Sequence, residues 1–330
     1  MNLKQAGKAF DVRWKPGEEE RLLSKARIWG IIRNVMLILG GLAAGFFFLF
    51  VPWFLARLGT TSRYHYPDPN DGKTPGSYAM NFEWVEFPAT DGVVLRGWFV
   101  PAEGKAHGTI IYCHGLNRTR IEMLPMAAFG HELGYDGLLF DLRHQGASGG
   151  ELTTLGYAER LDVIGAIRYA LGQQHAGRPV ILWGVSMGAA AALMAAAESP
   201  DVAAVISDSS FLSLRSTIEH HWRLFFRLPS FPLADEMVFW IGWRGAFRPS
   251  DFDVARAVTR IGDRPILFIA VHDDRRIPPS IAQTLCARAA SPHKALVVLP
   301  GRRHGEGFNE ANEQYKTAVR QFLAVPQPSE

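Results

Sequence analysis

The sequence predicts an α/β protein in which a mostly parallel sheet of about eight strands is covered by helices on both faces. Two observations lead to this fold class. Short apolar segments rich in β-branched residues alternate with longer helical segments from residue 108 onward. One strand-to-helix junction carries a serine flanked by glycines, Gly184-Val185-Ser186-Met187-Gly188. A charge-free stretch near the N-terminus adds a transmembrane helix to this fold.

The elements follow in order along the chain. An antiparallel hairpin is expected from strand-like alternation at 82–87 and 93–100, joined at Asp91-Gly92. Further strands are expected at 108–113, 136–141, 179–183, 203–207, 265–271 and 295–299, and helices at 119–133, 157–171, 187–198, 279–290 and 306–323.

The amino-acid composition excludes several classes of function. The 330 residues are 48% hydrophobic and carry a net charge of +3, so the chain holds one large core and no basic surface for nucleic acid. The two cysteines provide neither a disulfide framework nor metal-ligand spacing. We therefore expect no metal, no cofactor and no nucleic-acid partner. The sequence leaves the oligomeric state open.

The stretch from Val35 to Leu55 contains no charged residue, and 21 residues at about 1.5 Å each span a hydrocarbon layer of about 30 Å. Trp29 and Trp53 lie near its ends, where aromatic rings favour the membrane interface. A cleaved signal peptide or a buried core helix is the alternative. The expected organisation is a basic segment at 1–34, a transmembrane helix at 35–57, a linker at 58–81 and a catalytic domain at 82–325.

Basic residues around this span suggest its orientation. Within about 20 residues of its ends, five precede it and three follow it, which favours a single-pass protein with a cytoplasmic N-terminus and an extracytoplasmic catalytic domain. The residues counted are Lys15, Arg21, Lys25, Arg27 and Arg33 before the span, and Arg57, Arg63 and Lys73 after it.

Residues 211–250 interrupt the alternation of strands and helices. They hold nine aromatic residues and five arginines. An insertion of this length in an α/β protein is commonly a lid or binding element. We expect a helical lid whose aromatic residues form an apolar wall above the catalytic edge, suited to an apolar acyl substrate.

Reactive residues follow several expected strands. Ser186 follows 179–183, Asp273-Asp274 follows 265–271, and His304 comes five residues after 295–299. The carboxyl ends of parallel strands form the ligand-binding edge, so these side chains are expected to meet there. The order Ser, Asp, His matches serine hydrolases of this architecture. Asp208, directly after 203–207, is the alternative acid.

A serine hydroxyl needs a neighbouring imidazole to accept its proton, and that imidazole needs a carboxylate to fix its tautomer. The tetrahedral oxyanion needs N–H donors, and the backbone amides of Met187 and Leu116 are candidates. The sequence therefore points to acyl transfer through a covalent serine intermediate.

The motifs Cys113-His114-Gly115-Leu116, Phe140-Asp141-Leu142-Arg143, Gly146 to Gly150, Gly184 to Gly188, Asp274 to Pro278 and Gly301 to His304 together resemble the alpha/beta-hydrolase superfamily, from about Phe82 to the C-terminus. Thr154 to Asp162 resembles a bacterial membrane-anchored branch of uncertain substrate. The resemblance implies Asp274 rather than Asp273 as the acid, a structural His114, and Leu116 as an oxyanion donor. It departs at Arg143-His144-Gln145-Gly146, where Arg-Gly-His-Gly is usual.

We therefore expect a membrane-anchored serine hydrolase that cleaves carboxylic esters or related acyl compounds, with Ser186, Asp274 and His304 as the catalytic residues. Its expected partners are a small acyl substrate and the lipid bilayer. A serine peptidase of the same fold is the alternative activity, because fold and triad do not separate esters from amides. A catalytically inactive membrane-tethered interaction protein is the alternative of another class.

Overall fold

The computed structural model describes residues 17–172 and 178–324. It divides the chain into two compact units, Met1–Val51 and Pro52–Glu330. Residues 1–16, among them Lys15 of the charge count, lie outside the described residues, as does the domain boundary expected at residue 325.

The first unit holds the helix α1 (Glu18–Gly45) and a π-helical turn (Phe46–Phe50). Its apolar side chains are exposed; Leu37, for example, exposes 67% of its surface. One helical stretch, Glu20–Thr61, is long and apolar enough to cross a membrane. It is longer than the expected 35–57 because the polar residues on both sides of the apolar run continue the helix.

The second unit is built on one eight-stranded sheet with the order β1-β2-β4-β3-β5-β6-β7-β8. The pairs β1–β2 and β2–β4 are antiparallel and all other pairs are parallel, as the sequence predicted. The strands are β1 (Glu83–Pro88), β2 (Val94–Val100), β3 (Thr109–Cys113), β4 (Asp136–Phe140), β5 (Val180–Val185), β6 (Val202–Asp208), β7 (Ile266–Val271) and β8 (Lys294–Leu299).

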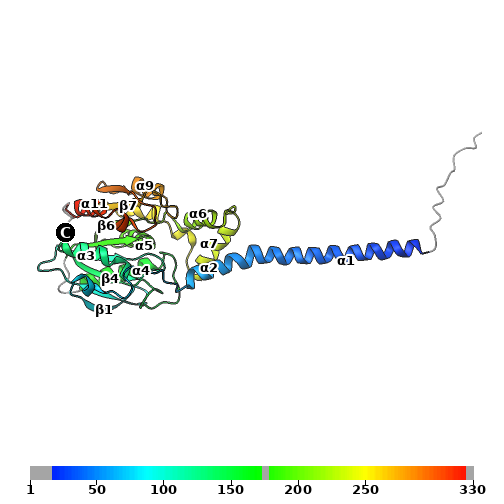
Figure 1. Cartoon of the computed structure of the whole chain (residues 1–330), viewed down its shortest axis with the longest axis horizontal. Coiled ribbons are helices and arrows are strands. Elements are labelled where there is room, and N and C mark those ends of the chain that lie inside the picture. The colour runs from blue at the N-terminus through cyan, green and yellow to red at the C-terminus, as the bar shows by residue number, and fades with distance from the viewer. Residues whose placement is uncertain (1–16, 173–177, 325–330) are drawn as a thin grey trace, which may run out of the picture. The chain divides into compact units, whose positions relative to one another are not determined.

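Helices flank the sheet (Figure 1), and an apolar cluster lies on each of its two faces. Successive strand residues alternate between them: Ile111 and Leu182 belong to one cluster, Tyr112 and Trp183 to the other. The first face packs against α4 (Glu159–Gly172), α5 (Met187–Glu198), α8 (Val254–Ala257) and α9 (Pro279–Arg288), and the second against α3 (Leu124–Glu132), α10 (Gly307–Glu310) and α11 (Asn312–Ala324). Short 3₁₀ turns complete the unit at Pro75–Tyr78, Arg120–Met123, Pro249–Asp251 and Val258–Arg260.

The insertion after β6 forms the helices α6 (Leu214–Phe226) and α7 (Leu233–Arg244). Trp222 and Ile241 turn inward and are buried in the first cluster. Residues 211–250 are thus helical, and we call α6, α7 and the loop between them the lid.

The helix α2 (Val51–Thr61) precedes the linker, and its last turns pack on the catalytic domain. Ala56 and Thr60 are fully buried. Residues 58–61, which the sequence suggested to be linker, are therefore helical and attached to the domain.

Candidate active site

Ser186 lies at a strained turn between β5 and α5. Its backbone has φ 56° and ψ −117°, a conformation that side chains rarely adopt. The glycines on either side are required by close packing. A Cβ on Gly188 would lie 2.1 Å from the carbonyl oxygen of Cys113, and one on Gly184 would lie 2.5 Å from the carbonyl oxygen of Gly188. This turn presents the Ser186 hydroxyl at the carboxyl edge of the sheet.

His304 and Asp274 are brought to the same edge by the loops after β8 and β7. The Nε2 atom of His304 lies 2.7 Å from Ser186 Oγ, and its Nδ1 atom lies 2.6 Å from Asp274 Oδ2. A carboxylate only accepts, so Nδ1 carries the proton and Nε2 is free to accept from the serine hydroxyl. The structure thus joins the three residues that the sequence singled out in one chain of hydrogen bonds.

The carboxylate of Asp274 is fixed by its own loop. Its Oδ1 atom accepts the backbone N–H groups of Arg276 at 2.8 Å and Ile277 at 3.0 Å, which leaves Oδ2 for His304. Asp273 points elsewhere and lies 2.9 Å from the ring of His272. Of the two adjacent aspartates, only Asp274 contacts the imidazole.

Asp208, the alternative acid, has other partners. Its two oxygens accept the hydroxyl groups of Ser209 at 2.8 Å and Tyr315 at 3.1 Å. Complete burial raises the pKa of this carboxyl to about 6. Asp208 is therefore part of the packing beneath the site and makes no hydrogen bond to His304 among the described contacts.

The two candidate oxyanion donors lie on either side of Ser186. Met187 is the first residue of α5, so its N–H belongs to the unpaired amides at a helix N-terminus. Leu116 follows Gly115, whose Cβ position would be 3.6 Å from Ser186 Cβ. Within the described part of the chain, neither the Met187 nor the Leu116 amide donates a hydrogen bond.

The buried side chain of His114 holds the peptide that carries the Leu116 N–H. His114 Nε2 accepts the Leu142 N–H at 3.0 Å, so its Nδ1 donates to the carbonyl of Gly115 at 2.8 Å. Since C=O and N–H point in opposite directions across a trans peptide, this bond turns the Leu116 N–H away from the His114 ring. Burial lowers the pKa of His114, which keeps its ring neutral in this role.

Glu122 is a contributor that the sequence gave no reason to select. Its Oε2 atom accepts the Gly115 N–H at 2.6 Å, so both polar groups of the Gly115 backbone are held. Burial raises the pKa of Glu122 to about 7, against the opposing effects of that N–H and of Arg118. Its signal, an acidic residue in a short turn seven positions after His-Gly, is too common to be diagnostic.

Glu310 holds the loop that carries His304. Its carboxylate accepts the N–H groups of Arg302 at 2.8 Å and Arg303 at 3.2 Å, and it also pairs with the Arg303 side chain at 2.7 Å. Glu310 comes six residues after His304 in the sequence and was not among the predicted site residues.

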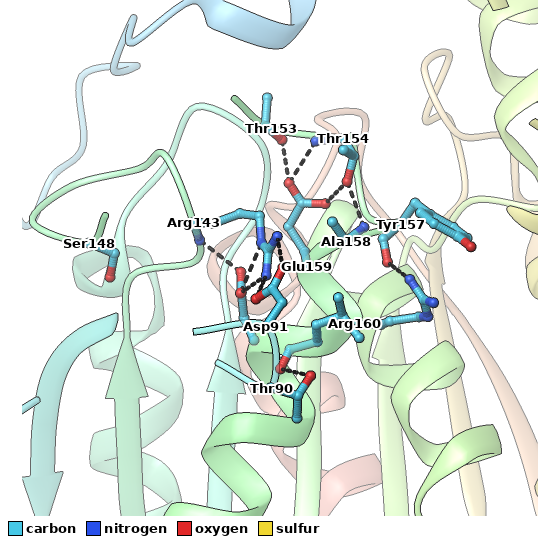
Figure 2. A network of polar contacts seen from close by, with 12 residues as sticks. Thr90, Asp91, Arg143, Ser148, Thr153, Thr154, Tyr157, Ala158, Glu159 and Arg160 are labelled. Carbon is cyan, nitrogen blue, oxygen red and sulfur yellow. Dashed lines mark hydrogen bonds and ion pairs between the residues drawn. The ribbon is translucent and has the colours of Figure 1, made fainter. Parts of the chain in front are cut away.

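The buried carboxylate of Glu159 holds the loop that precedes α4 (Figure 2). Glu159 is fully buried and accepts four hydrogen bonds, from the hydroxyls of Thr153 and Thr154 at 2.6 Å each and from the N–H groups of Thr154 at 2.9 Å and Gly156 at 2.8 Å. The Thr153 hydroxyl lies 3.6 Å from Met187 Sδ. The motif that begins at Thr154 therefore encodes a fixed loop behind the candidate oxyanion donor.

Arg143 completes this network (Figure 2). Its guanidinium bonds Asp162 and Asp91 at 2.7–2.9 Å, and its own N–H donates to Asp162 at 2.8 Å. The next residue, His144, takes the place of the usual glycine with φ 63°, a region that favours glycine. The departure from Arg-Gly-His-Gly thus places a histidine in a left-handed turn and leaves the arginine in a buried ion pair.

A cavity of about 1140 Å³ opens beside His304 and Asp274. The lid contributes His220 and Leu224 to its lining, and His220 Nε2 lies 2.7 Å from the carbonyl oxygen of Arg275. The surrounding loops contribute three acidic residues, Asp273, Asp274 and Glu306, and five arginines, Arg118, Arg275, Arg276, Arg302 and Arg303.

The lining of this cavity differs from the expected apolar wall. The aromatic side chains of the lid are not among its lining residues in the described structure. Phe231 and Trp243, for example, are exposed instead. Trp243 is exposed on α7, whose buried side carries Ile241, and Phe231 lies in the loop between α6 and α7. Among the described residues, no group of three His, Cys, Asp or Glu side chains is placed to hold a metal ion.

Known proteins match most of this chain. A sequence profile described as "Serine aminopeptidase, S33" matches residues 104–235. The uncharacterized protein YqkD of Bacillus subtilis is 29% identical over 250 residues, which cover 74% of this chain and 81% of YqkD. The uncharacterized protein Rv2307c of Mycobacterium tuberculosis is 30% identical over 237 residues, 71% of this chain and 76% of Rv2307c. An uncharacterized membrane protein of Saccharomyces cerevisiae, YNL320W, is 23% identical over 300 residues, 87% of this chain and 95% of that protein.

Among solved structures, the esterase Pf2001 of Pyrococcus furiosus superimposes with a TM-score of 0.66 and 24% identity. The match covers 81% of this chain and 99% of the esterase. At this level of identity the likeness concerns the fold.

Proposed function

Because the chain belongs to the alpha/beta-hydrolase superfamily, we propose that it is a serine hydrolase that cleaves carboxylic esters or related acyl compounds through an acyl-enzyme on Ser186. The proposal assigns Ser186 as nucleophile, His304 as general base and acid, and Asp274 as the acid that orients His304. It assigns the amides of Met187 and Leu116 as the oxyanion hole.

The observation that supports the proposal most is the unbroken hydrogen-bond chain from Ser186 Oγ through His304 to Asp274, with links of 2.7 Å and 2.6 Å. Serine catalysis needs a base within hydrogen-bond reach of the hydroxyl and an orienting group on the far nitrogen of that base. An inactive interaction protein has no need to keep this arrangement and a strained turn together.

The geometry supports the following reaction. Ser186 Oγ attacks the acyl carbonyl carbon while its proton moves to His304 Nε2, and Asp274 stabilises the imidazolium that results. The negative charge develops on the former carbonyl oxygen, between the amides of Met187 and Leu116. Collapse of this intermediate breaks the bond to the leaving group, which takes the proton from His304.

Water completes the cycle. It attacks the acyl group on Ser186 while His304 accepts one of its protons, and the second tetrahedral intermediate releases the carboxylic acid. The proton on His304 returns to Ser186 Oγ. Apart from the substrate and water, these reaction steps use only side-chain and backbone groups of this chain.

The alternative is an aminopeptidase, which the name of the matching profile suggests. An aminopeptidase binds a cationic amino terminus beside its nucleophile. The cavity next to His304 is lined by five arginines against three acidic residues, Asp273, Asp274 and Glu306, and this excess of positive charge disfavours a cation. This lining favours ester cleavage over the removal of N-terminal residues.

Active-site labelling tests the proposal. The full chain should react with a fluorophosphonate probe, and Ser186→Ala should abolish labelling and lower kcat by about 10⁴-fold or more. Ser280→Ala, which removes an exposed serine at the start of α9, is the matched control and should label like the wild type. Equal labelling of the Ser186→Ala and wild-type proteins would refute the assignment.

We further propose that the helix Glu20–Thr61 anchors the chain in a membrane with the catalytic domain on the extracytoplasmic side. The charge bias around the span supports this orientation, since basic residues prefer the cytoplasmic flank. Protease added to intact spheroplasts should then digest the domain after residue 58. Protection of the domain until the membrane is permeabilised would reverse the orientation.

A further inference from the structure

The helix α2 is attached to the catalytic edge of the domain (Figure 1). The carbonyl oxygen of Thr60 accepts the Thr153 N–H at 2.9 Å, and its hydroxyl accepts Arg244 Nε at 2.9 Å. Thr153 lies in the loop between β4 and α4, and Arg244 ends the lid helix α7. Both segments follow the carboxyl ends of strands, so α2 docks at the same edge as Ser186.

This attachment fixes how far the lid can lie from a bilayer. The charge-free run ends at Leu55, five residues before Thr60, which is about 7.5 Å of helix at 1.5 Å per residue. The headgroup layer on each side of a bilayer is about 5–7 Å thick. The contact between Thr60 and Arg244 therefore lies at about the outer limit of the headgroups whatever course the preceding helix takes.

The outer side of the lid is apolar. Six large side chains there expose between 46% and 77% of their surface: Phe225, Phe226, Leu228, Phe231, Phe239 and Trp243. We call them the lid face. Soluble surfaces rarely gather this many large apolar groups on two adjoining helices, and such a face indicates a partner. Leu58 of α2 is 52% exposed as well.

Cationic groups lie on the same edge. Arg275 and Arg276 follow β7, and Arg302 follows β8, all three with exposed side chains at the cavity beside His304. Within the described residues, none of these three side chains pairs with a carboxylate, whereas Arg118 and Arg303 do. Guanidinium groups bind phosphate well because their N–H groups match its oxygens in pairs.

We propose that the catalytic edge rests on the bilayer that anchors the chain, with the lid face in the lipid interface and Arg275, Arg276 and Arg302 bound to the phosphates of anionic phospholipids. Aromatic side chains favour this depth, and arginines near an anionic leaflet are attracted to it. The inference rests on the proposed membrane anchor. Its consequence is that the active site opens toward lipid, so the substrate is an acyl ester carried in the membrane.

Depth-dependent quenching tests this arrangement in the full chain. A nitrobenzoxadiazole probe is attached at Phe231→Cys in a Cys286→Ser background, and the protein is placed in nanodiscs with nitroxide-labelled lipids. The control probe is at Asp201→Cys, an exposed residue just before β6 on the opposite edge. We expect quenching at position 231 to exceed that at position 201 severalfold, and to rise at least twofold when phosphatidylglycerol replaces part of the phosphatidylcholine.

A charge-matched pair of variants tests the arginines. Replacing Arg275, Arg276 and Arg302 by Gln should remove the gain from phosphatidylglycerol. The same change at Arg178, Arg260 and Arg288, three exposed arginines at the amino edge, should preserve it. If the gain persists in the first variant or is lost in both, the arginines do not bind the lipid headgroups.

Other outcomes overturn the proposal without touching the proposed function. Equal quenching at positions 231 and 201 would place the lid face in water. Quenching that depends on two chains per disc, or protection of position 231 from an aqueous quencher in lipid-free micelles, would assign the face to a protein partner. Co-elution with the discs reports the anchor and fluorophosphonate labelling reports the hydrolase site, so a failure of either is recognised in the same sample.

Discussion

The ends of β6 and β7 each carry a buried aspartate, and the two side chains have different partners. Asp208 is the last residue of β6, and its carboxylate is held by the hydroxyls of Ser209 and Tyr315. Asp274 comes three residues after β7 ends, in a loop whose amides fix one oxygen and leave the other for His304. Burial and a place near the carboxyl end of a strand are common to both. The loop that lets the carboxylate reach the imidazole distinguishes them.

The largest expected difference between the two aspartates is in the turnover of their Asn variants. Asp274→Asn should lower kcat by about 10³–10⁴-fold, because an amide no longer fixes the His304 tautomer or stabilises the imidazolium. Asp208→Asn should cost less than about tenfold, since Asp208 makes no hydrogen bond to the imidazole among the described contacts. Hydrolysis of a p-nitrophenyl ester by both variants measures the difference. A greater loss in Asp208→Asn would reverse the assignment of the acid.

The next effect is on stability as a function of pH. Burial raises the pKa of Asp208 to about 6 from an ordinary 3.8, so the folded state binds a proton more tightly than the unfolded state. Its stabilising contribution is full below pH 4 and is lost as pH rises through 6, by at most about 3 kcal/mol. Thermal unfolding of the wild type and of Asp208→Asn should therefore converge or cross between pH 4.5 and 7, the wild type losing more. Parallel pH profiles would mean that Asp208 titrates normally.

The smallest effect is expected at Tyr315. Its hydroxyl donates to Asp208 and accepts the buried N–H of Trp183 at 3.2 Å. Tyr315→Phe leaves both partners unsatisfied and should destabilise the fold by about 1–2 kcal/mol while kcat changes less than threefold. Tyr169→Phe, on the other face of the sheet, is the control. A loss of activity comparable to that of Asp274→Asn would connect Asp208 to catalysis after all.

Much of the fold was predictable because the period of the hydrophobic residues along the chain changes at almost every boundary between a strand and a helix. The eight strands and the antiparallel start of the sheet follow from that period. Ser186, His304 and the pair Asp273-Asp274 could be selected because each comes shortly after a strand, and short loops confine a side chain to one edge. Within that pair, the family resemblance implied Asp274. Glu122 and Glu310 could not, since they act through backbone amides that no spacing rule identifies. The sequence did not indicate which lid aromatics face outward, because large apolar side chains occur on both the buried and the exposed sides of α6 and α7.

The account depends most on a covalent acyl group at Ser186. Brief reaction of the full chain with a p-nitrophenyl ester, acid quenching and mass analysis of the proteolytic peptides would detect it directly. We expect one peptide, the one containing Ser186, to gain the mass of the acyl group, and His304→Ala to lack the adduct. Hydrolysis with no acylated peptide, or an adduct on a different residue, would contradict the proposed mechanism.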